Sequence, residues 1–411
     1  MIRKVIIVSI VMWLCGCMAN KGESQFEELL AKAPKFEGEA DCGVSNAAAF
    51  RILGNSDWQD SSEIKYFIEY QTIVDGGTEI TNYFNSSDKK YIREIAAKSF
   101  ARWQPHIGKP IREVSKKNDA NMLLVFKLID GIGRHAALTD FAQTGDEFDP
   151  KLKRWMVQMR FDLYDIYKVI KDRESAKYNF EFICKHEIGH GIFNLMHNED
   201  YSIMNENKKW RDIQFDDVYA ARIVYKKFEN FDFDGNRYTW ITKSNKNATL
   251  NFKQSELYTR CANPNYNNGH FLSTKTIAGL QYIRTHYNCP IKINSSYRHL
   301  QCNKDASGAT YSSHVFANAL DFRFIGPNAK KATDNYIRDV RLNGTSLQML
   351  LNIGIRGFGS YSSGALHIDS RHIPNGGGNK KSFGIDWIWW GIFIQQNEGA
   401  FNLFDDFSKY D

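Results

Sequence analysis

Several patterns that mark particular protein classes are missing from this chain of 411 residues. It has no CxxC pair, which argues against a zinc site built from cysteines. Its net charge of +6 is spread along the chain instead of forming a basic run, so nothing indicates nucleic-acid recognition. No internal repeat is present. With 43% hydrophobic and 14% aromatic residues, the chain can build packed cores, and its length suits two domains.

The first 17 residues have the features of an export signal. A positive pair at residues 3–4 precedes an apolar run at residues 5–14, which is too short to span a bilayer. The run ends in LCGC, which resembles the bacterial lipobox and implies that Cys17 is acylated. The alternative is an ordinary secretory signal that is cut nearby. Both interpretations place the mature protein outside the cytoplasm, and the first adds a lipid anchor in the membrane of the cell envelope.

Without Cys15 and Cys17, five of the seven cysteines remain. Five is an odd number, so at least one thiol has no partner within the mature chain. Cys261, Cys289 and Cys302 are close in sequence, and we expect a disulfide among them, although spacing does not define the pairing.

Hydrophobic periodicity predicts both strands and helices, and therefore an α+β protein. We expect strands at residues 64–73, 121–129 and 155–161, and helices at residues 88–103, 180–195 and 216–228, with Asp88 as a helix cap. Residues 229–254 are rich in Asn, Asp and Lys, and DFDGN there lacks the ligand pattern of a calcium loop, which leaves a turn. The predicted division is a signal peptide at 1–17, a tether and lead-in at 18–60, a first domain at 61–228, a linker at 229–254, a second domain at 255–393 and a tail at 394–411.

The sequence HEIGH carries the first candidate site. His186 and His190 are four residues apart on a predicted helix, so both imidazoles lie on one face and can bind one zinc ion. Glu187 is placed to take a proton from zinc-activated water as the general base. A catalytic zinc needs a third protein ligand, and His197 is the candidate. We expect the helix to end near Asn194, so that the chain turns back toward the metal.

Around these residues the chain resembles the metzincin metalloproteases, and most closely the matrixins, whose pattern is HExxHxxGxxH followed by a methionine turn. Met204 matches that methionine. Phe193 stands at the expected glycine position, and His197 comes one residue late, but Asn194 keeps the family's spacing to the third histidine. We therefore infer one inserted residue. The resemblance covers roughly residues 60–228 and implies a mixed sheet with an active-site helix.

His314, Asp321 and His367 form the second candidate site. Two histidines and a carboxylate make a zinc set that leaves one position open. By spacing alone, however, unrelated polar residues are the better interpretation, so the surrounding sequence has to decide between the two.

That surrounding sequence reads SSYR at 295–298, SSHVFANALD at 312–321 and HID at 367–369. It resembles the zinc D-alanyl-D-alanine carboxypeptidases and murein endopeptidases, whose motifs are SGYR, SxHxxGxAxD and HxD. The resemblance covers about residues 255–393 and implies a small α+β domain. It also implies that His314, Asp321 and His367 bind zinc, and that Arg298 stabilises the developing oxyanion, a role that suits its fixed charge.

Two residues depart from that pattern. Ala317 replaces the family's glycine, which is a small change if the backbone φ angle there is negative. Gly364 stands three residues before His367, where some relatives carry the general base. Asp369 is then either the base or a residue that orients a metal ligand, and we favour the second role.

The combined prediction is a lipid-anchored bacterial envelope protein with two zinc ions, one per domain. The first domain would cleave protein or peptide substrates, and the second would cleave peptidoglycan peptides. In one alternative, only one domain is catalytic and the other binds the cell wall or a protein. In another, the chain is a non-enzymatic surface lipoprotein with structural zinc. Structural zinc favours four protein ligands, whereas each site here offers three, which favours catalysis.

Overall fold

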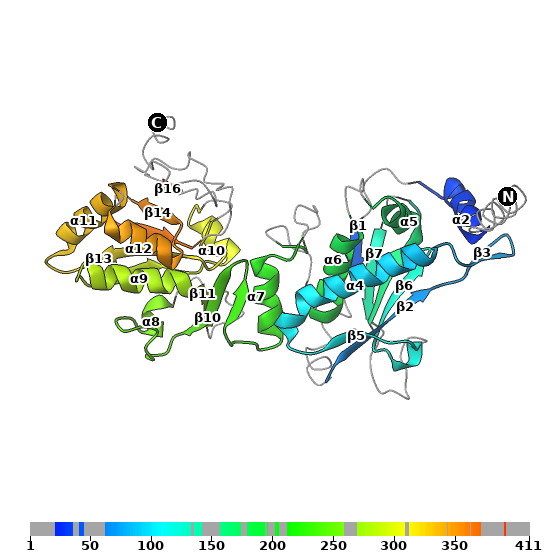
Figure 1. Ribbon diagram of the computed structural model, residues 1–411, viewed down its shortest axis with the longest axis horizontal. Coiled ribbons are helices and arrows are strands. Elements are labelled where there is room, and N and C mark those ends of the chain that lie inside the picture. The colour runs from blue at the N-terminus through cyan, green and yellow to red at the C-terminus, as the bar shows by residue number, and fades with distance from the viewer. Residues whose placement is uncertain are drawn as a thin grey trace, which may run out of the picture. The chain divides into compact units, whose positions relative to one another are not determined.

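The computed structural model describes residues 21–35, 41–44, 62–132, 135–141, 157–173, 179–193, 195, 202–204, 212–258, 269–308, 312–342, 344–361, 363–370 and 390–391. The chain divides into two compact units, Met1–Lys227 and Phe228–Asp411. Each unit contains helices and strands (Figure 1), which confirms the α+β class. Within the described part of the chain, no helix combines the length and apolar character needed to cross a membrane.

A six-stranded mixed sheet forms the centre of the first unit. Only the pair β7–β8 is antiparallel, and the other neighbouring strands run parallel. The three predicted strands are present with bounds that differ by up to three residues at each end. The central strand β6 is buried almost throughout, as its continuous apolar sequence predicts. In spatial order the strands are β1 (Asp41–Val44), β7 (His135–Phe141), β8 (Val157–Asp162), β6 (Met122–Lys127), β2 (Ile64–Tyr70) and β5 (Ile111–Glu113). A separate hairpin pairs β3 (Ile73–Asp75) with β4 (Thr78–Ile80).

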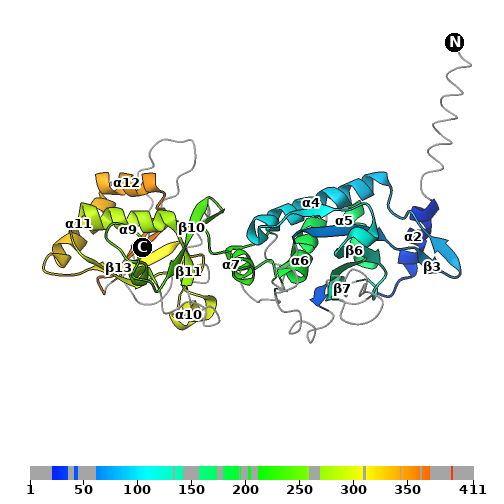
Figure 2. The ribbon, with the colours of Figure 1, turned by 90° about the horizontal axis from the view of Figure 1, so that it is seen from below.

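Helix α4 (Ser86–Ile107) runs along the sheet in Figures 1 and 2 and contacts α6 (Phe180–Phe193) and α7 (Phe215–Val224). Its N-cap is Asn85, which corrects the prediction of Asp88. The Asn85 side chain accepts from the Asp88 backbone N–H at 2.9 Å, and the Asp88 carboxylate accepts from the Asn85 N–H at 3.2 Å. Asp88 is therefore the third-position member of a capping box. The other helices that the structure describes in this unit are α2 (Lys21–Lys32), α5 (Leu163–Lys171) and the short 3₁₀ helix η2 (Lys117–Asp119).

Helix α6 carries the HEIGH sequence and is buried on all sides, which makes it a central helix. Even Lys185 is buried, and its ammonium group pairs with Glu181 at 2.6 Å and Asp212 at 2.9 Å. The indole N–H of Trp103 donates to the Lys185 carbonyl at 3.0 Å and ties α4 to α6. This packing gives the histidines of α6 a rigid support.

The second unit contains two antiparallel sheets. The five-stranded sheet has the order β12 (Ile291–Ser295), β13 (Ala319–Phe324), β15 (Leu366–Asp369), β14 (Gly357–Ser360) and β16 (Trp390–Gly391). Helices α9 (Thr274–His286) and α11 (Ala329–Arg341) contact this sheet, and α12 (Thr345–Ile353) packs on both helices. Figure 1 shows these elements together. The three-stranded sheet has the order β11 (Gly269–Ser273), β10 (Asn236–Thr242) and β9 (Phe231–Phe233), and the short helices are α8 (Gln254–Leu257) and α10 (Leu300–Asp305).

The segment predicted as a linker, residues 229–254, is instead an integral part of the second unit. Its strands β9 and β10 form a hairpin whose turn residues, Asp234 and Gly235, have φ angles of 46° and 71°. Strand β10 pairs with β11, and Ile241 and Phe252 belong to the unit's hydrophobic core. Exposed polar residues between the buried apolar ones give this segment a linker-like composition, although its alternation is that of a half-buried strand.

The disulfide expected among Cys261, Cys289 and Cys302 remains a prediction, since Cys261 lies outside the described residues. Cys302 is disulfide-bonded. Cys289 is free and buried, so it is not the partner that the grouping of three cysteines offered. Cys184 is also free and buried beside the HEIGH sequence, and burial raises the pKa of its thiol.

Candidate metal sites

Two adjacent strands and a turn bring the ligand candidates of the second unit together. Asp321 on β13 lies directly opposite His367 on β15 in the antiparallel register. Side chains at directly opposed positions share one face of a sheet. His314 comes from the turn that precedes β13. The ligand atoms of all three residues lie within 4.8 Å of one another, and all three side chains are buried.

Hydrogen bonds orient both histidines of this cluster. The Nδ1 of His314 contacts the Ser296 carbonyl at 2.5 Å, which leaves its Nε2 facing Asp321 Oδ2 at 3.2 Å. His367 is turned the other way, since its Nδ1 faces Asp321 Oδ1 at 2.8 Å and its Nε2 contacts Asp369 Oδ2 at 3.1 Å. Each imidazole thus directs one nitrogen at the cluster and has the other held by an oxygen acceptor, as metal-binding histidines do.

These separations fit a zinc site. Ligand atoms about 2.0–2.1 Å from a tetrahedral zinc ion lie about 3.3 Å from one another. The distances of 3.2 Å and 2.8 Å from the imidazoles to the Asp321 oxygens are close to this value. Two imidazole nitrogens and one carboxylate are also a donor set that zinc accepts while a fourth position stays open. His314, Asp321 and His367 are therefore the residues that would hold the ion.

Burial and neighbouring charges act in opposite directions on the protonation of this cluster. Burial is the largest influence on His314 and lowers its pKa. Burial alone would raise the pKa of Asp321, but the two histidines hold it well below its ordinary value. Burial alone would lower the pKa of His367, but its contacts with Asp321 and Asp369 outweigh burial and raise it. The carboxylate is thus held ionised, as a metal ligand must be.

Arg298 and Tyr361 also reach Asp321. The Arg298 guanidinium donates to Asp321 Oδ2 at 2.6 Å and to the Ser295 hydroxyl at 2.7 Å, which places a fixed positive charge beside the cluster. The Tyr361 hydroxyl donates to Asp321 Oδ1 at 3.0 Å. Sequence reasoning did not select Tyr361 as a site residue. Its one signal in the sequence was its place at the end of GFGSY, shortly before HID.

The backbone explains one departure from the family pattern and corrects the reading of the other. Gly364 has a φ angle of 78° and its N–H donates to the Tyr361 carbonyl in the turn between β14 and β15. A residue that carries a Cβ atom is disfavoured there, which accounts for the missing carboxylate. Ala317 has a φ angle of 53°. The substitution of the family's glycine is thus not a small change, because the left-handed conformation costs an alanine about 1 kcal/mol or more.

The first unit brings two of its three predicted ligands together. The Nδ1 atoms of His186 and His190 contact the carbonyls of Ile203 and Leu195 at 2.8 Å and 2.7 Å. Their Nε2 atoms lie 3.1 Å apart, a separation that suits two ligands of one zinc ion. Both imidazoles therefore present Nε2 to a common point beside α6.

Glu187 and Met204 lie next to these histidines. The Thr139 hydroxyl on β7 donates to the Glu187 carboxylate, so the glutamate is held between α6 and the neighbouring strand. Met204 is buried, and its sulfur packs so closely on Gly189 that a Cβ atom at that position would lie 2.4 Å from it. The methionine thus lies against the helix between the two histidines. His197, Asn194 and Cys17 are outside the described residues, so the third ligand, the turn and the lipidated position remain predictions.

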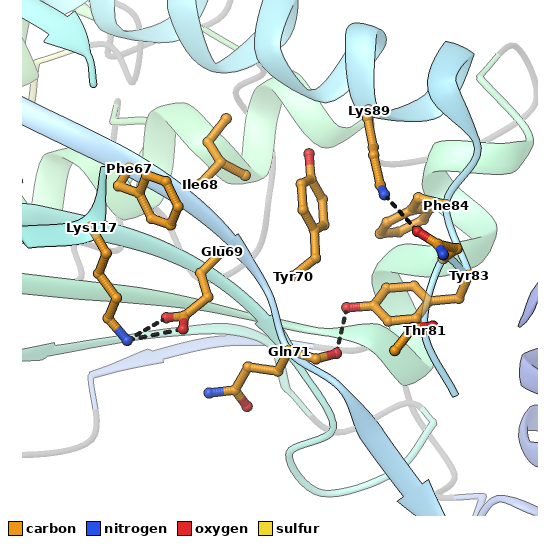
Figure 3. A pocket seen from close by; sticks show the side chains of 11 residues that line it. Phe67, Ile68, Glu69, Tyr70, Gln71, Thr81, Tyr83, Phe84, Lys89 and Lys117 are labelled. Carbon is orange, nitrogen blue, oxygen red and sulfur yellow. Dashed lines mark hydrogen bonds and ion pairs between the residues drawn. The ribbon is translucent and has the colours of Figure 1, made fainter. Parts of the chain in front are cut away.

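A separate pocket of about 520 Å³ in the first unit contains none of the predicted ligands (Figure 3). Its polar groups interact with one another. The Lys117 ammonium pairs with Glu69 at 2.9 Å, and the Tyr83 hydroxyl donates to the Gln71 carbonyl at 3.1 Å. Lys89 donates to the Asn82 side chain at 3.3 Å. These pairs stabilise the local structure, and we assign the pocket no chemistry.

Comparison with known protein families gives a match for one part of the chain. Residues 246–353, about a quarter of the chain, match the family model described as Peptidase M15. Comparison with curated proteins gives no match. The matched residues include Arg298, His314 and Asp321, whereas His367 and Asp369 follow them. The match does not reach the first unit, whose resemblance to the matrixins remains a prediction. It supports a zinc metallopeptidase domain in the second unit.

Proposed function

We propose that the second unit is a zinc-dependent peptidase that cleaves the stem peptides or peptide cross-links of peptidoglycan. The observation that carries the proposal is the convergence of His314, Asp321 and His367 in and just after the segment that matches Peptidase M15. The export signal and Cys17 would place this activity in the cell envelope, on the side where peptidoglycan lies.

The residues around the cluster have separate roles in this proposal. A bound zinc ion would supply Lewis-acid polarisation of the scissile carbonyl and of water. Arg298 places its positive charge where negative charge develops on the substrate oxygen. Asp369 accepts from His367 Nε2 and so directs the Nδ1 lone pair of that imidazole into the cluster. Tyr361 fixes the orientation of the Asp321 carboxylate.

Digestion of purified peptidoglycan by the full chain tests this function, with the released peptides identified by mass spectrometry. We expect peptide-bond cleavage that a chelator abolishes and zinc restores. His314→Ala should remove the activity, whereas the same change at His286, an exposed histidine of α9, should leave it intact. Cleavage that persists in His314→Ala would refute the assignment.

We further propose that the first unit is a second zinc peptidase, which acts on proteins or peptides. The specific observation is that the Nε2 atoms of His186 and His190 lie 3.1 Å apart beside Glu187. Glu187 is then the general base for the attacking water. Strand β1 lies along the edge of β7, with Val44 opposite Thr139. An extended substrate that pairs with β7 would have to replace β1.

Paired substitutions separate the two activities. Glu187→Ala should abolish cleavage of a denatured protein such as casein and leave peptide release from peptidoglycan unchanged, and His314→Ala should do the reverse. Metal analysis gives an independent measure, with two equivalents of zinc expected per chain. One equivalent would show that only one unit is a zinc site, and casein cleavage by Glu187→Ala would contradict the role of that glutamate.

A further inference from the structure

A network of buried polar side chains lies behind the cluster of His314, Asp321 and His367. Its members come from segments that are far apart in the sequence, and each is at most 8% exposed. They are Asn236 and Tyr238 on β10, Ser273 at the end of β11, Thr276 on α9, Asn318 before β13 and Ser370 after β15. Asn236 and Tyr238 precede the segment that matches Peptidase M15, so the family match does not include this part of the network.

Hydrogen bonds from several segments hold the backbone of the turn that carries His314, and three of them come from the network. The Ser273 N–H donates to the Ala317 carbonyl at 2.8 Å. The Asn318 carbonyl accepts from the Thr276 hydroxyl at 2.6 Å and from the Ser370 N–H at 3.0 Å. These two carbonyls belong to consecutive residues between His314 and the start of β13. The turn is therefore fixed by β11, α9 and the end of β15 together.

The hydroxyl protons of the network have a consistent direction. Because Thr276 donates to the Asn318 carbonyl, its oxygen accepts from Ser370, at 2.9 Å. The Ser370 oxygen then accepts from Ser273, at 2.8 Å. The Asn236 amide donates to the Ser370 carbonyl at 3.0 Å. Thr276 and Ser370 thus each donate one hydrogen bond and accept one, and the Ser273 hydroxyl also lies 3.4 Å from Asn236 Oδ1. Buried polar groups that satisfy one another in this way favour one arrangement.

Tyr238 connects strand β10 to this turn through one side-chain hydrogen bond. Its hydroxyl donates to Asn318 Oδ1 at 2.8 Å, and the tyrosine is 1% exposed. Asn318 is four residues after His314 and three before Asp321, so the bond reaches the centre of the segment that carries both ligands. The turn also contains the left-handed Ala317, a conformation that persists only where neighbouring contacts determine it.

We propose that Tyr238 and Asn318 are positioning residues of the metal site, and that the functional zinc domain includes β9 and β10. Through Asn318, Tyr238 holds the strained turn in the geometry that directs His314 and Asp321 at one ion. This inference rests on the proposed zinc function of the second unit. It adds that a domain begun at residue 246, where the family match begins, would bind the ion more weakly.

Zinc affinity of the full chain tests the proposal. The background carries His186→Ala, so that the first unit does not contribute, and the dissociation constant is measured by competition with a chelating indicator. Tyr238→Phe removes only the phenol oxygen. Loss of a hydrogen bond made directly to a metal ligand weakens metal binding by about 10-fold to 100-fold, and Tyr238 acts one step farther away, through Asn318. We therefore expect an affinity that is weaker by up to about tenfold.

Tyr336→Phe is the matched control. Tyr336 is 2% exposed in the core of the same unit, and its hydroxyl has no hydrogen-bond partner among the residues that the structure describes. We expect its zinc affinity to equal that of the background. Melting curves of the metal-free proteins measure any structural effect separately. A lower melting midpoint for Tyr238→Phe with unchanged zinc affinity would show a merely structural role and overturn the proposal.

A double-mutant cycle tests whether Tyr238 acts through Asn318. Asn318→Ala should weaken zinc binding about as much as Tyr238→Phe, and the double variant should show little further loss, because both changes remove the hydrogen bond between Tyr238 and Asn318. Losses that multiply in the double variant would contradict this route. Failure of the background protein itself to bind zinc would instead refute the proposed function, and this inference with it.

Discussion

Replacement of Asp369 by Asn distinguishes the two roles that this residue can have. Its carboxylate is fully buried and lies 3.1 Å from His367 Nε2. An asparagine oxygen can still accept that hydrogen bond but carries no charge, and charge-assisted hydrogen bonds are about twice as strong as neutral ones. If Asp369 orients His367, the substitution weakens zinc binding about tenfold, which equals about 1.4 kcal/mol. At saturating zinc, kcat should then fall by less than tenfold.

A general base would give the opposite result. Loss of such a base costs about 100-fold to 10,000-fold in kcat and leaves zinc affinity unchanged. The assay is peptide release from peptidoglycan at saturating zinc, together with the zinc dissociation constant, both in the His186→Ala background. Asp369→Ala extends the series, since it removes the acceptor entirely and should weaken zinc binding by up to about 100-fold. A collapse of kcat with unchanged zinc affinity in Asp369→Asn would refute the orienting role.

Three further predictions test other parts of the second unit. In Gly357→Ala, the added Cβ atom would lie 2.1 Å from Asp369 Oδ2, so we expect weaker zinc binding in the same titration. In Gly359→Ala, the nearest atom, His367 Cβ, is 3.2 Å away, so the loss of zinc affinity should be smaller. Ala317 has a left-handed φ angle of 53°, which glycine adopts without strain, whereas Ala319 lies in strand β13. In denaturant titrations, Ala317→Gly should therefore lower the free energy of unfolding by at least about 1 kcal/mol less than Ala319→Gly does. Burial lowers the pKa of His270 to about 3. Between this value and the ordinary pKa of 6.5, the histidine is protonated in the unfolded chain and neutral in the folded chain, so the free energy of unfolding falls as the pH drops below 6.5. This histidine should account for about 3 kcal/mol of lost stability between pH 7 and pH 4.5. His270→Phe should remove this part of the pH dependence of stability. A pH profile equal to that of the unsubstituted protein would contradict the role given to His270.

The predictions that succeeded depend on local periodicity. The apolar run in β6 and the helical spacing in α4, α6 and α7 identified these elements within a few residues of their bounds. The boundaries shifted where a side-chain hydrogen bond decided the helix start, as Asn85 did for α4. The linker prediction failed because composition was weighed above the apolar positions: Phe231, Phe233, Tyr238 and Ile241 are buried, although polar residues surround them.

Sequence by itself named the candidate metal ligands, through the helical spacing of His186 and His190 and through the motifs that surround the second set. It named His314, Asp321 and His367 without showing that the last two lie opposite one another on adjacent strands. Only the tertiary structure decided that His367 directs Nδ1 at the cluster while Asp369 holds its Nε2, because imidazole orientation depends on acceptors brought together by strand pairing. It alone brought Tyr361 to Asp321, and Tyr238 to Asn318 across 80 residues. Contacts between distant segments follow from chain packing, and no local pattern in the sequence encodes them.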